Sequence, residues 1–168
     1  MLRASVMRSI SLFASVLLGL FAIFYTAAII SYSPADRAFN SAAGNTEHNW
    51  MGQTGAYLAD GMLFTFGIAA IFLSPLILVM ARRLWLTQEQ AYWRRQVLLA
   101  LAAMAVSGIA LGLWQGSADA GLPAGYGGIA GLISAKAIMA LLAPLDAPWP
   151  LVGRSAIVIA GLAGGIWL

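Results

Sequence analysis

The sequence predicts an all-α integral membrane protein with four transmembrane helices and a short interfacial or re-entrant helix in the second external loop. The first observation is composition: hydrophobic residues make up 61% of the 168-residue chain, charged residues only 9%, and the mean hydropathy is +0.86. A soluble domain carries about 25% charged residues. This chain therefore has too little polar surface for a soluble enzyme and too much apolar surface for a disordered one.

The second observation is a set of long apolar runs, since about 20 apolar residues cross a bilayer core as a helix. The first run covers residues 10–32 and follows Arg3 and Arg8. A signal peptide is the alternative, but its apolar part holds only about 7–15 residues before a cleavage site. We therefore expect a retained helix.

The second run covers residues 61–80 and lies between Asp60 and the pair Arg82-Arg83. Asp60 is expected to cap the start of this helix, where the helix dipole would stabilise its negative charge. Pro75 lies inside the run and is expected to kink the helix or to end its regular part.

The third run covers residues 97–114, and the fourth covers 151–168 after Pro148 and Pro150, which suit the approach to a helix. Arg154, in the first turn of the fourth run, is expected to extend its long side chain to the lipid headgroups.

Residues 129–143 are also apolar, but Lys136 lies at their centre. A charge at the centre of a spanning helix costs about 2.5–3.5 kcal/mol on insertion scales. We expect a short helix that lies in the interface or re-enters the membrane, with a fifth span as the alternative.

The third observation is the placement of the basic residues, which predicts the orientation. With a cytoplasmic N-terminus, the cytoplasmic side holds Arg3, Arg8, Arg82, Arg83, Arg94 and Arg95, and the outer side holds Arg37, Lys136 and Arg154. The positive-inside rule then predicts a multi-pass protein with both termini cytoplasmic, external loops 33–59 and 115–150, and a cytoplasmic loop 81–96. The chain stops at Leu168 inside an apolar run, which predicts that the native protein continues beyond it.

Few residues could carry chemistry. The chain has no cysteine and a single histidine, His48, whereas metal sites need several ligands at fixed spacing. We expect no catalytic residue, no cofactor and no metal in this segment. The basic residues form no stripe, so direct contact with DNA is not expected. No charged pair lies within a run, which disfavours the alternative function, a small membrane transporter or channel subunit.

Polar and turn-forming residues concentrate in the first external loop and at its exit. They are Ser33, Pro34, Asp36, Asn40, Asn49, Trp50, Gly52, Gly55 and Asp60. They predict a compact turn on the membrane surface, which either ties two helix ends together or binds a partner. A second group is expected to pack helices closely, because glycines four apart let helix backbones approach. Its members are Gly108 with Gly112 and Gly161 with Gly165.

The first external loop resembles the N-terminal four-helix membrane domain of the FtsK/SpoIIIE DNA translocases. The resemblance is carried by Ser33-Pro34-x-Asp36, Asn40, Asn49-Trp50-x-Gly52-x-x-Gly55-Ala56-Tyr57-Leu58-Ala59-Asp60, Gly67 and the block Gly127-Gly128-Ile129-x-Gly131. Gly67 joins the residues expected to pack helices. The chain departs from the family where Arg37-Ala38 follows Asp36, since the family often has Pro-Ser there.

The resemblance implies a membrane anchor and divisome-assembly module at the septum of the bacterial inner membrane, coupling chromosome segregation to septation. It implies other septal division proteins as partners and a hexamer formed through a cytoplasmic motor. It also implies that ATP and Mg belong to that motor and not to this segment.

Overall fold

The computed structural model describes residues 2–40, 47–86, 93–115, 121–143 and 152–160. Its helices are α1 (Leu2–Ile30), α2 (Gly52–Phe66), α3 (Leu73–Trp85), α4 (Trp93–Gln115) and α5 (Gly128–Leu142), and the 3-10 segment η1 (Gly67–Phe72) joins α2 to α3. Residues 152–160 are also helical. These described ranges contain helices and no strand, and the predicted all-α membrane class is confirmed.

Within the described part, three helical stretches are long and apolar enough to cross a membrane: Val6–Ile30, Gly52–Trp85 and Arg94–Trp114. Gly128–Leu142 is apolar but shorter. Of the predicted fourth span, residues 152–160 are helical and the others lie outside the described residues. The fourth crossing stays a prediction.

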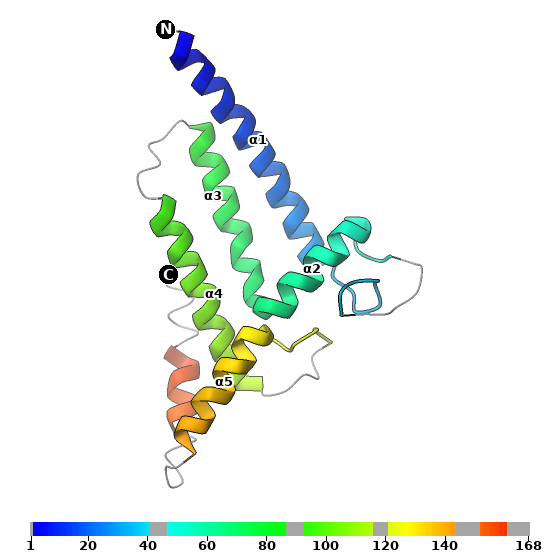
Figure 1. The fold of residues 1–168 in the computed structure, drawn as a ribbon, viewed down its shortest axis with the longest axis vertical. Coiled ribbons are helices and arrows are strands. Elements are labelled where there is room, and N and C mark those ends of the chain that lie inside the picture. The colour runs from blue at the N-terminus through cyan, green and yellow to red at the C-terminus, as the bar shows by residue number, and fades with distance from the viewer. Residues whose placement is uncertain (1, 41–46, 87–92, 116–120, 144–151, 161–168) are drawn as a thin grey trace.

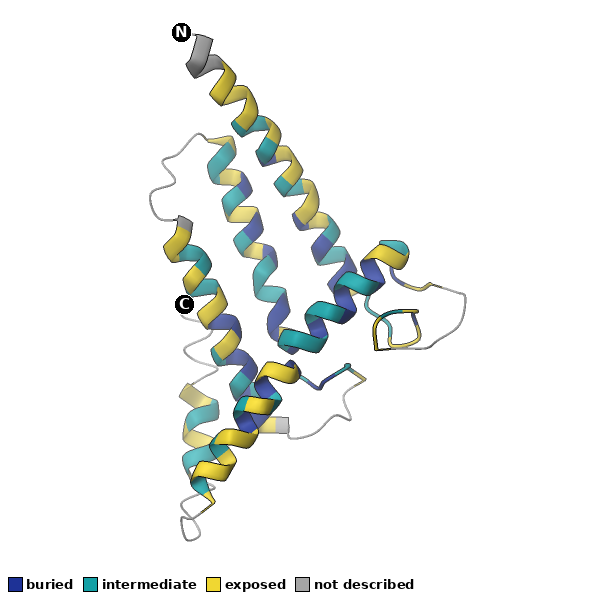
Figure 2. Ribbon diagram, viewed as in Figure 1, coloured by how far each residue is buried: buried dark blue, intermediate teal, exposed yellow. Residues whose placement is uncertain are grey.

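The helices α1, α3 and α4 run side by side, and α2 lies at an angle to them near the C-terminal end of α1 (Figure 1). The helix α1 packs mainly on α3, and α4 packs mainly on α5. Figure 2 shows buried residues gathered where α1, α2 and α3 meet. The core there consists of Ala22, Tyr25, Ala28, Ile29, Ala59, Leu63, Ala70 and Ile77.

Hydroxyl groups of α1 donate hydrogen bonds to backbone carbonyls of the elements packed against it. The Ser15 hydroxyl donates to the Ala81 carbonyl at 2.7 Å, and the Tyr25 hydroxyl donates to the Ala70 carbonyl at 2.8 Å. Lipid tails are as apolar as side chains, so helices in a bilayer associate through close packing and such interhelical hydrogen bonds. The Tyr25 bond reaches η1, where the regular helical pattern is interrupted.

The interruption of the second predicted helix begins at Gly67, before Pro75, and this corrects the expectation that Pro75 causes it. Gly67 has a φ of +61°, and the adjacent Ile68 N–H donates to the Tyr126 carbonyl at 2.9 Å. Contact with the segment that precedes α5 therefore accompanies the break. Pro75 is the third residue of α3, in a first turn that tolerates the missing N–H.

The helix boundaries differ from the expected loops at two places. The helix α2 begins at Gly52, so its first turns occupy the end of the predicted loop 33–59. The helix α3 ends at Trp85 and the helix α4 begins at Trp93, so each occupies part of the predicted loop 81–96. Polar residues at these ends of α2, α3 and α4 weaken the hydropathy signal on which the predicted limits rested.

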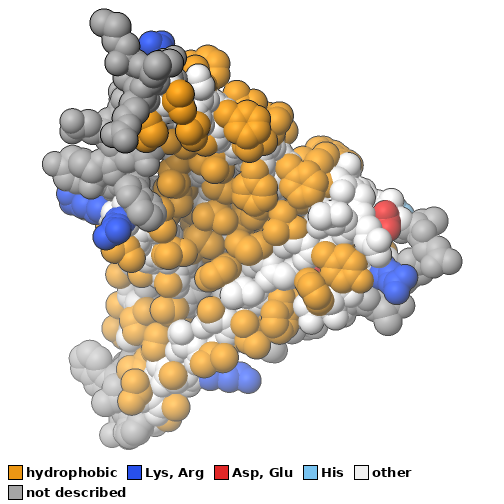
Figure 3. All heavy atoms as spheres, turned by 45° about the horizontal axis from the view of Figure 1, so that its top comes forward, with side chains coloured by type: hydrophobic (Ala, Val, Ile, Leu, Met, Phe, Trp, Pro, Cys, Tyr) orange, Lys and Arg blue, Asp and Glu red, His pale blue; other side chains and the backbone are white. Residues whose placement is uncertain are grey.

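Apolar side chains cover the middle of the face in Figure 3, and charged side chains lie at its edges. On α1 the exposed apolar residues include Phe13, Leu17 and Leu20. A contiguous exposed apolar surface of this extent suits contact with lipid.

Candidate functional site

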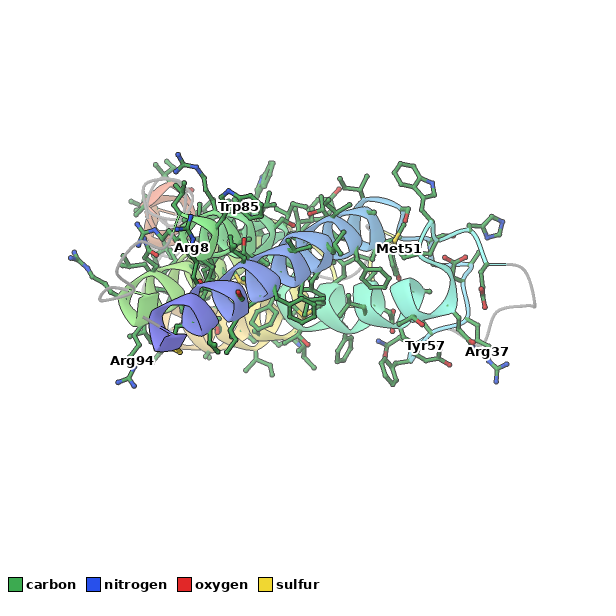
Figure 4. All side chains as sticks on the ribbon, turned by 90° about the horizontal axis from the view of Figure 1, so that it is seen from above. Arg8, Arg37, Met51, Tyr57, Trp85 and Arg94 are labelled. Carbon is green, nitrogen blue, oxygen red and sulfur yellow. The ribbon has the colours of Figure 1, made fainter. Side chains whose placement is uncertain are left out.

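The connection between α1 and α2, here called the α1–α2 turn, comprises residues 31–51, of which 31–40 and 47–51 are described. In Figure 4, Arg37, Met51 and Tyr57 lie at one end of the molecule, and Arg8 and Arg94 lie at the other. The α1–α2 turn, which holds most of the polar residues singled out in the sequence, therefore lies at the C-terminal end of α1, away from Arg8.

Asn49 joins the end of α1 to the start of α2. Its side chain is only 5% exposed, and its Nδ2 donates to the Ala28 carbonyl at 2.9 Å. Its Oδ1 accepts the Met51 N–H at 3.0 Å, and its carbonyl accepts the Gly52 N–H at 2.9 Å. Asn49 thus supplies partners to free backbone groups at two helix ends.

Two glycines allow the chain to close around Asn49. Gly52 has a φ of +65°, a conformation that L side chains rarely adopt. A Cβ at Gly55 would fall closer than 3.0 Å to Asn49 Oδ1 and to Met51 Cβ. The first turn of α2 therefore has no room for a side chain at Gly55.

Asp60 ties the first half of the α1–α2 turn to α2. Its side chain is almost fully buried, and its Oδ2 accepts both the backbone N–H and the side-chain Nδ2 of Asn40 at 3.0 Å. Hydrogen bonds to a charged acceptor are stronger than neutral ones. Asp60 lies in the middle of α2, so the expectation that it caps this helix is wrong: the helix begins earlier, beside Asn49.

Asp36 ties the second half of the turn to the residues just after α1. It is also buried, and its Oδ1 accepts the His48 backbone N–H at 2.7 Å. The Nδ1 of the His48 ring lies 3.0 Å from the same oxygen, although 60% of the His48 side chain is exposed. Ser33 shapes the preceding bend, since its carbonyl accepts the Asp36 N–H at 3.2 Å.

Tyr32 reports the electrostatics around the two carboxylates. Burial raises the pKa of its hydroxyl, and the negative charges of Asp60 and Asp36 add to the effect, to about 12. Beside it, the Ser31 hydroxyl accepts the Trp50 N–H at 3.0 Å and donates to the Ala27 carbonyl at 2.6 Å. Side-chain hydrogen bonds thus hold the described parts of the turn.

Large aromatic side chains lie exposed on this turn. Trp50 is 71% exposed and Phe39 is 74% exposed. The Phe39 ring meets the Tyr57 ring edge to face, with 4.9 Å between centroids. The arrangement offers aromatic surface on a polar scaffold, which suits binding. Among the described residues no group of three or more His, Cys, Asp or Glu side chains could hold a metal ion.

A second structural site, here called the glycine crossing, comprises Gly67, Gly108, Gly112, Gly127, Gly128 and Gly131. A Cβ at Gly112 would lie 2.7 Å from the Gly131 carbonyl oxygen. A Cβ at Gly131 or Gly127 would collide with the backbone of Gly108. The backbones of α4 and α5 therefore touch without intervening side chains.

The same crossing extends to η1. A Cβ at Gly67 would collide with the Tyr126 carbonyl, and a Cβ at Gly128 would collide with the Gly67 nitrogen. Gly128 also has a φ of +64°. The glycine crossing thus joins three elements, η1, α4 and the start of α5.

Comparison with known families gives a match over nearly the whole chain. A family model described as the 4TM region of DNA translocase FtsK/SpoIIIE matches residues 8–168. The chain belongs to this family. No solved structure matches it. Membership makes the chain a membrane-anchoring region of the FtsK/SpoIIIE translocases, a role that requires no catalysis in this segment.

The structure of this FtsK/SpoIIIE 4TM region places all nine residues predicted for the first external loop in the α1–α2 turn or on α2. Pro34 is exposed there. Of the residues predicted to pack helices, Gly67, Gly108 and Gly112 lie in the glycine crossing, whereas Gly161 and Gly165 lie outside the described residues. Binding of a partner by the α1–α2 turn stays a prediction.

The sequence did not indicate the contacts of three residues, His48, Phe39 and Arg154. His48 enters the sequence analysis only as an unsuitable metal ligand, whereas in the structure its ring contacts Asp36. Phe39 was not singled out, and its apolar type within a polar loop was the available signal. Arg154 donates from its Nε to the Leu113 carbonyl at 2.6 Å and from its Nη2 to the Trp114 carbonyl at 3.0 Å, two contacts that the sequence did not indicate. That Arg154 reaches the lipid headgroups stays a prediction. A cation suits this position, since the C-terminal end of α4 has unpaired carbonyls and a negative partial charge.

Proposed function

We propose that this FtsK/SpoIIIE 4TM region is the membrane anchor and divisome-assembly module of a bacterial cell-division DNA translocase. In this proposal, the α1–α2 turn contacts other septal division proteins and so couples chromosome segregation to septation. Hexamer formation, ATP and Mg belong to the translocase's motor, and this segment makes no direct contact with DNA. The family match supports the anchoring part of the proposal.

The observation that carries the partner-binding part is the contrast between the surface and the interior of the α1–α2 turn. Phe39 and Trp50 are exposed, while Asp36, Asn49 and Asp60 beneath them are buried and hydrogen-bonded. Aromatic residues dominate binding hot spots in protein interfaces. A scaffold held before binding also lowers the entropy lost on association. Such a turn is better suited to recognition than a loop without internal bonds.

The proposal requires the α1–α2 turn to lie outside the cytoplasm. Support comes from basic residues at the helix ends that lie away from this turn. They are Arg8 near the start of α1, Arg82 and Arg83 near the end of α3, and Arg94 at the start of α4. The positive-inside rule assigns that end, and with it both termini, to the cytoplasm.

The chain has no cysteine, so single cysteines can report this orientation. In intact cells, a membrane-impermeant thiol reagent should label a cysteine at Phe39 and should label one at Trp85 only after permeabilisation. The reverse pattern would place the α1–α2 turn in the cytoplasm and exclude the proposed contact with external parts of septal proteins.

The function is tested by removing the exposed aromatic surface while keeping the scaffold. In dividing cells that carry a fluorescent fusion, the double variant F39A/W50A should lose most of its enrichment at the septum at an unchanged membrane level. The matched control is W114A, because Trp114 is 64% exposed at the end of α4 and away from the turn. Normal septal enrichment of F39A/W50A, or equal loss in W114A, would contradict the proposal.

A further inference from the structure

A cavity of about 270 Å³ lies between α4, α5 and the helical residues 152–160. Its lining combines apolar surface with two cations, and consists of Gly112, Leu113, Leu132, Ala135, Lys136, Met139 and Arg154. This cavity is separate from the α1–α2 turn, and it uses none of the residues to which the proposed partner contact was assigned.

The positive charge of Arg154 is fixed at the edge of this cavity. Two of its N–H groups donate to the Leu113 and Trp114 carbonyls, which hold the guanidinium in place. An arginine side chain has five N–H donors, and carbonyl groups do not remove its charge. Lys136 adds a second cation from α5, where it is exposed.

The described acidic residues lie elsewhere. Asp36 and Glu47 belong to the α1–α2 turn and Asp60 belongs to α2, and neither element lines the cavity. Within the described part of the chain, the cavity therefore combines a positive edge with an apolar wall. The complementary ligand has an anionic group next to a hydrocarbon chain.

We propose that this cavity binds an anionic phospholipid. The phosphate lies between Lys136 and Arg154, and an acyl chain lies against Leu113, Leu132 and Met139. The surroundings support a lipid, since α4 is long and apolar enough to span a membrane and exposes Trp114 at this end. Tryptophan is enriched where membrane helices reach the headgroups, and Lys136 and Arg154 supply positive charge that attracts an anionic headgroup.

Net charge is the property that distinguishes this ligand from other lipids. A zwitterionic lipid offers the same phosphate and acyl chains but adds a cationic group near the two basic side chains. Inorganic phosphate offers the anion without the chain and leaves the apolar wall unused. The site should therefore prefer phosphatidylglycerol to phosphatidylcholine with identical acyl chains, and should prefer either lipid to free phosphate.

The test uses the intact protein purified in detergent, with lipid binding measured by native mass spectrometry. Phosphatidylglycerol should bind about tenfold more tightly than phosphatidylcholine. K136Q should remove most of this preference, and its exposed position leaves the helix contacts in place. R37Q removes an equal charge from an exposed arginine on the α1–α2 turn and should keep the preference.

R154Q is a second variant and should also lose the preference, but it removes two helix-end hydrogen bonds, so K136Q decides the matter if R154Q does not fold. Equal binding of the two lipids, or an unchanged preference in K136Q, would overturn the proposal. Binding of inorganic phosphate as tight as that of phosphatidylglycerol would show a simple anion site and would also overturn the proposal. The function proposed for the α1–α2 turn is unaffected by these outcomes, because it is tested through F39A/W50A.

Discussion

The α1–α2 turn and the glycine crossing hold helices together in opposite ways. In the turn, the buried side chains of Asn49, Asp36 and Asp60 form hydrogen bonds across the connection. In the glycine crossing, backbone touches backbone, and the missing side chains of Gly128 and Gly131 make the contact possible. One site depends on particular polar atoms, and the other depends on the absence of a Cβ.

This difference separates two tasks within one membrane domain. A contact of bare backbones leaves no side chain to face a partner, so the glycine crossing sets the helix arrangement. A turn held from beneath by polar groups leaves its outer surface available for binding. Phe39 and Trp50 can therefore be substituted without loss of the fold. The two sites should therefore respond differently to the smallest substitutions.

The largest effect is expected in the glycine crossing. In G128A the new Cβ would meet the backbone of Gly67 and Thr65, and alanine would have to adopt a φ of +64°. Overpacking costs about 1–3 kcal/mol and a left-handed non-glycine residue adds about 1–2 kcal/mol. Thermal unfolding in detergent should show a loss of roughly 3 kcal/mol or more.

The control for this substitution is G19A on α1, because a Cβ at Gly19 meets nothing within 4 Å. G19A should be neutral or more stable by less than about 1 kcal/mol, since alanine favours the helix. Equal stability of G128A and G19A would show that the crossing does not depend on close backbone contact.

The next effect is expected at Asp60. D60A leaves the two Asn40 donors without their charged acceptor and should destabilise the protein by about 1.5–3 kcal/mol. D60N keeps an acceptor oxygen and should lose less. The measurement is chemical unfolding in detergent, followed for the single variants and for D60A/N40A. If D60A and N40A destabilise additively, the side-chain contact between them contributes nothing.

The fold class could be predicted from the sequence because long apolar runs and basic ends are local signals that need no tertiary information. The start of α2 could not, because residues 52–60 mix polar and small side chains and the helix begins at a side-chain contact of Asn49. Hydropathy marks where a helix is apolar, and a polar first turn falls outside that signal.

The candidate site was predicted as a set of residues but not as a set of contacts. The residue types of Asn40 and Asp60 were informative, yet their pairing spans 20 positions with no periodic signal. The glycine pair Gly108 and Gly112 indicated close packing, but not its partner in α5. Arg154 binds carbonyls 41 and 40 positions away, and backbone carbonyls carry no sequence signature.

A smaller effect is expected at Asn49. N49A removes the acceptor of the Met51 N–H and the donor to the Ala28 carbonyl. Loss of a side chain that satisfies a helix start costs about 1 kcal/mol. N49D keeps the acceptor and should retain part of this stability in thermal unfolding. An unchanged melting temperature in N49A would indicate that solvent replaces both bonds.

The last effect is expected at Tyr32, and it is absent near neutral pH and appears only at alkaline pH. The pKa of its hydroxyl is raised from 10.0 to about 12 by burial and by the two carboxylates. A raised folded pKa stabilises the protein below pH 10, and this contribution is lost as the pH rises through 12. Wild-type stability should therefore fall more steeply than that of Y32F between pH 10 and pH 12, as measured by unfolding at each pH. Parallel profiles would contradict this placement of Tyr32.

Site-specific photo-crosslinking in dividing cells tests the division of tasks most directly. A photoreactive residue replaces Trp50 on the α1–α2 turn or, as the control, Phe13, which is 67% exposed on α1. We expect protein adducts with other septal division proteins from position 50, and none from position 13 on the apolar surface of α1. Adducts from position 13 alone, or equal adducts from both positions, would contradict the claim that the turn is the partner-binding surface.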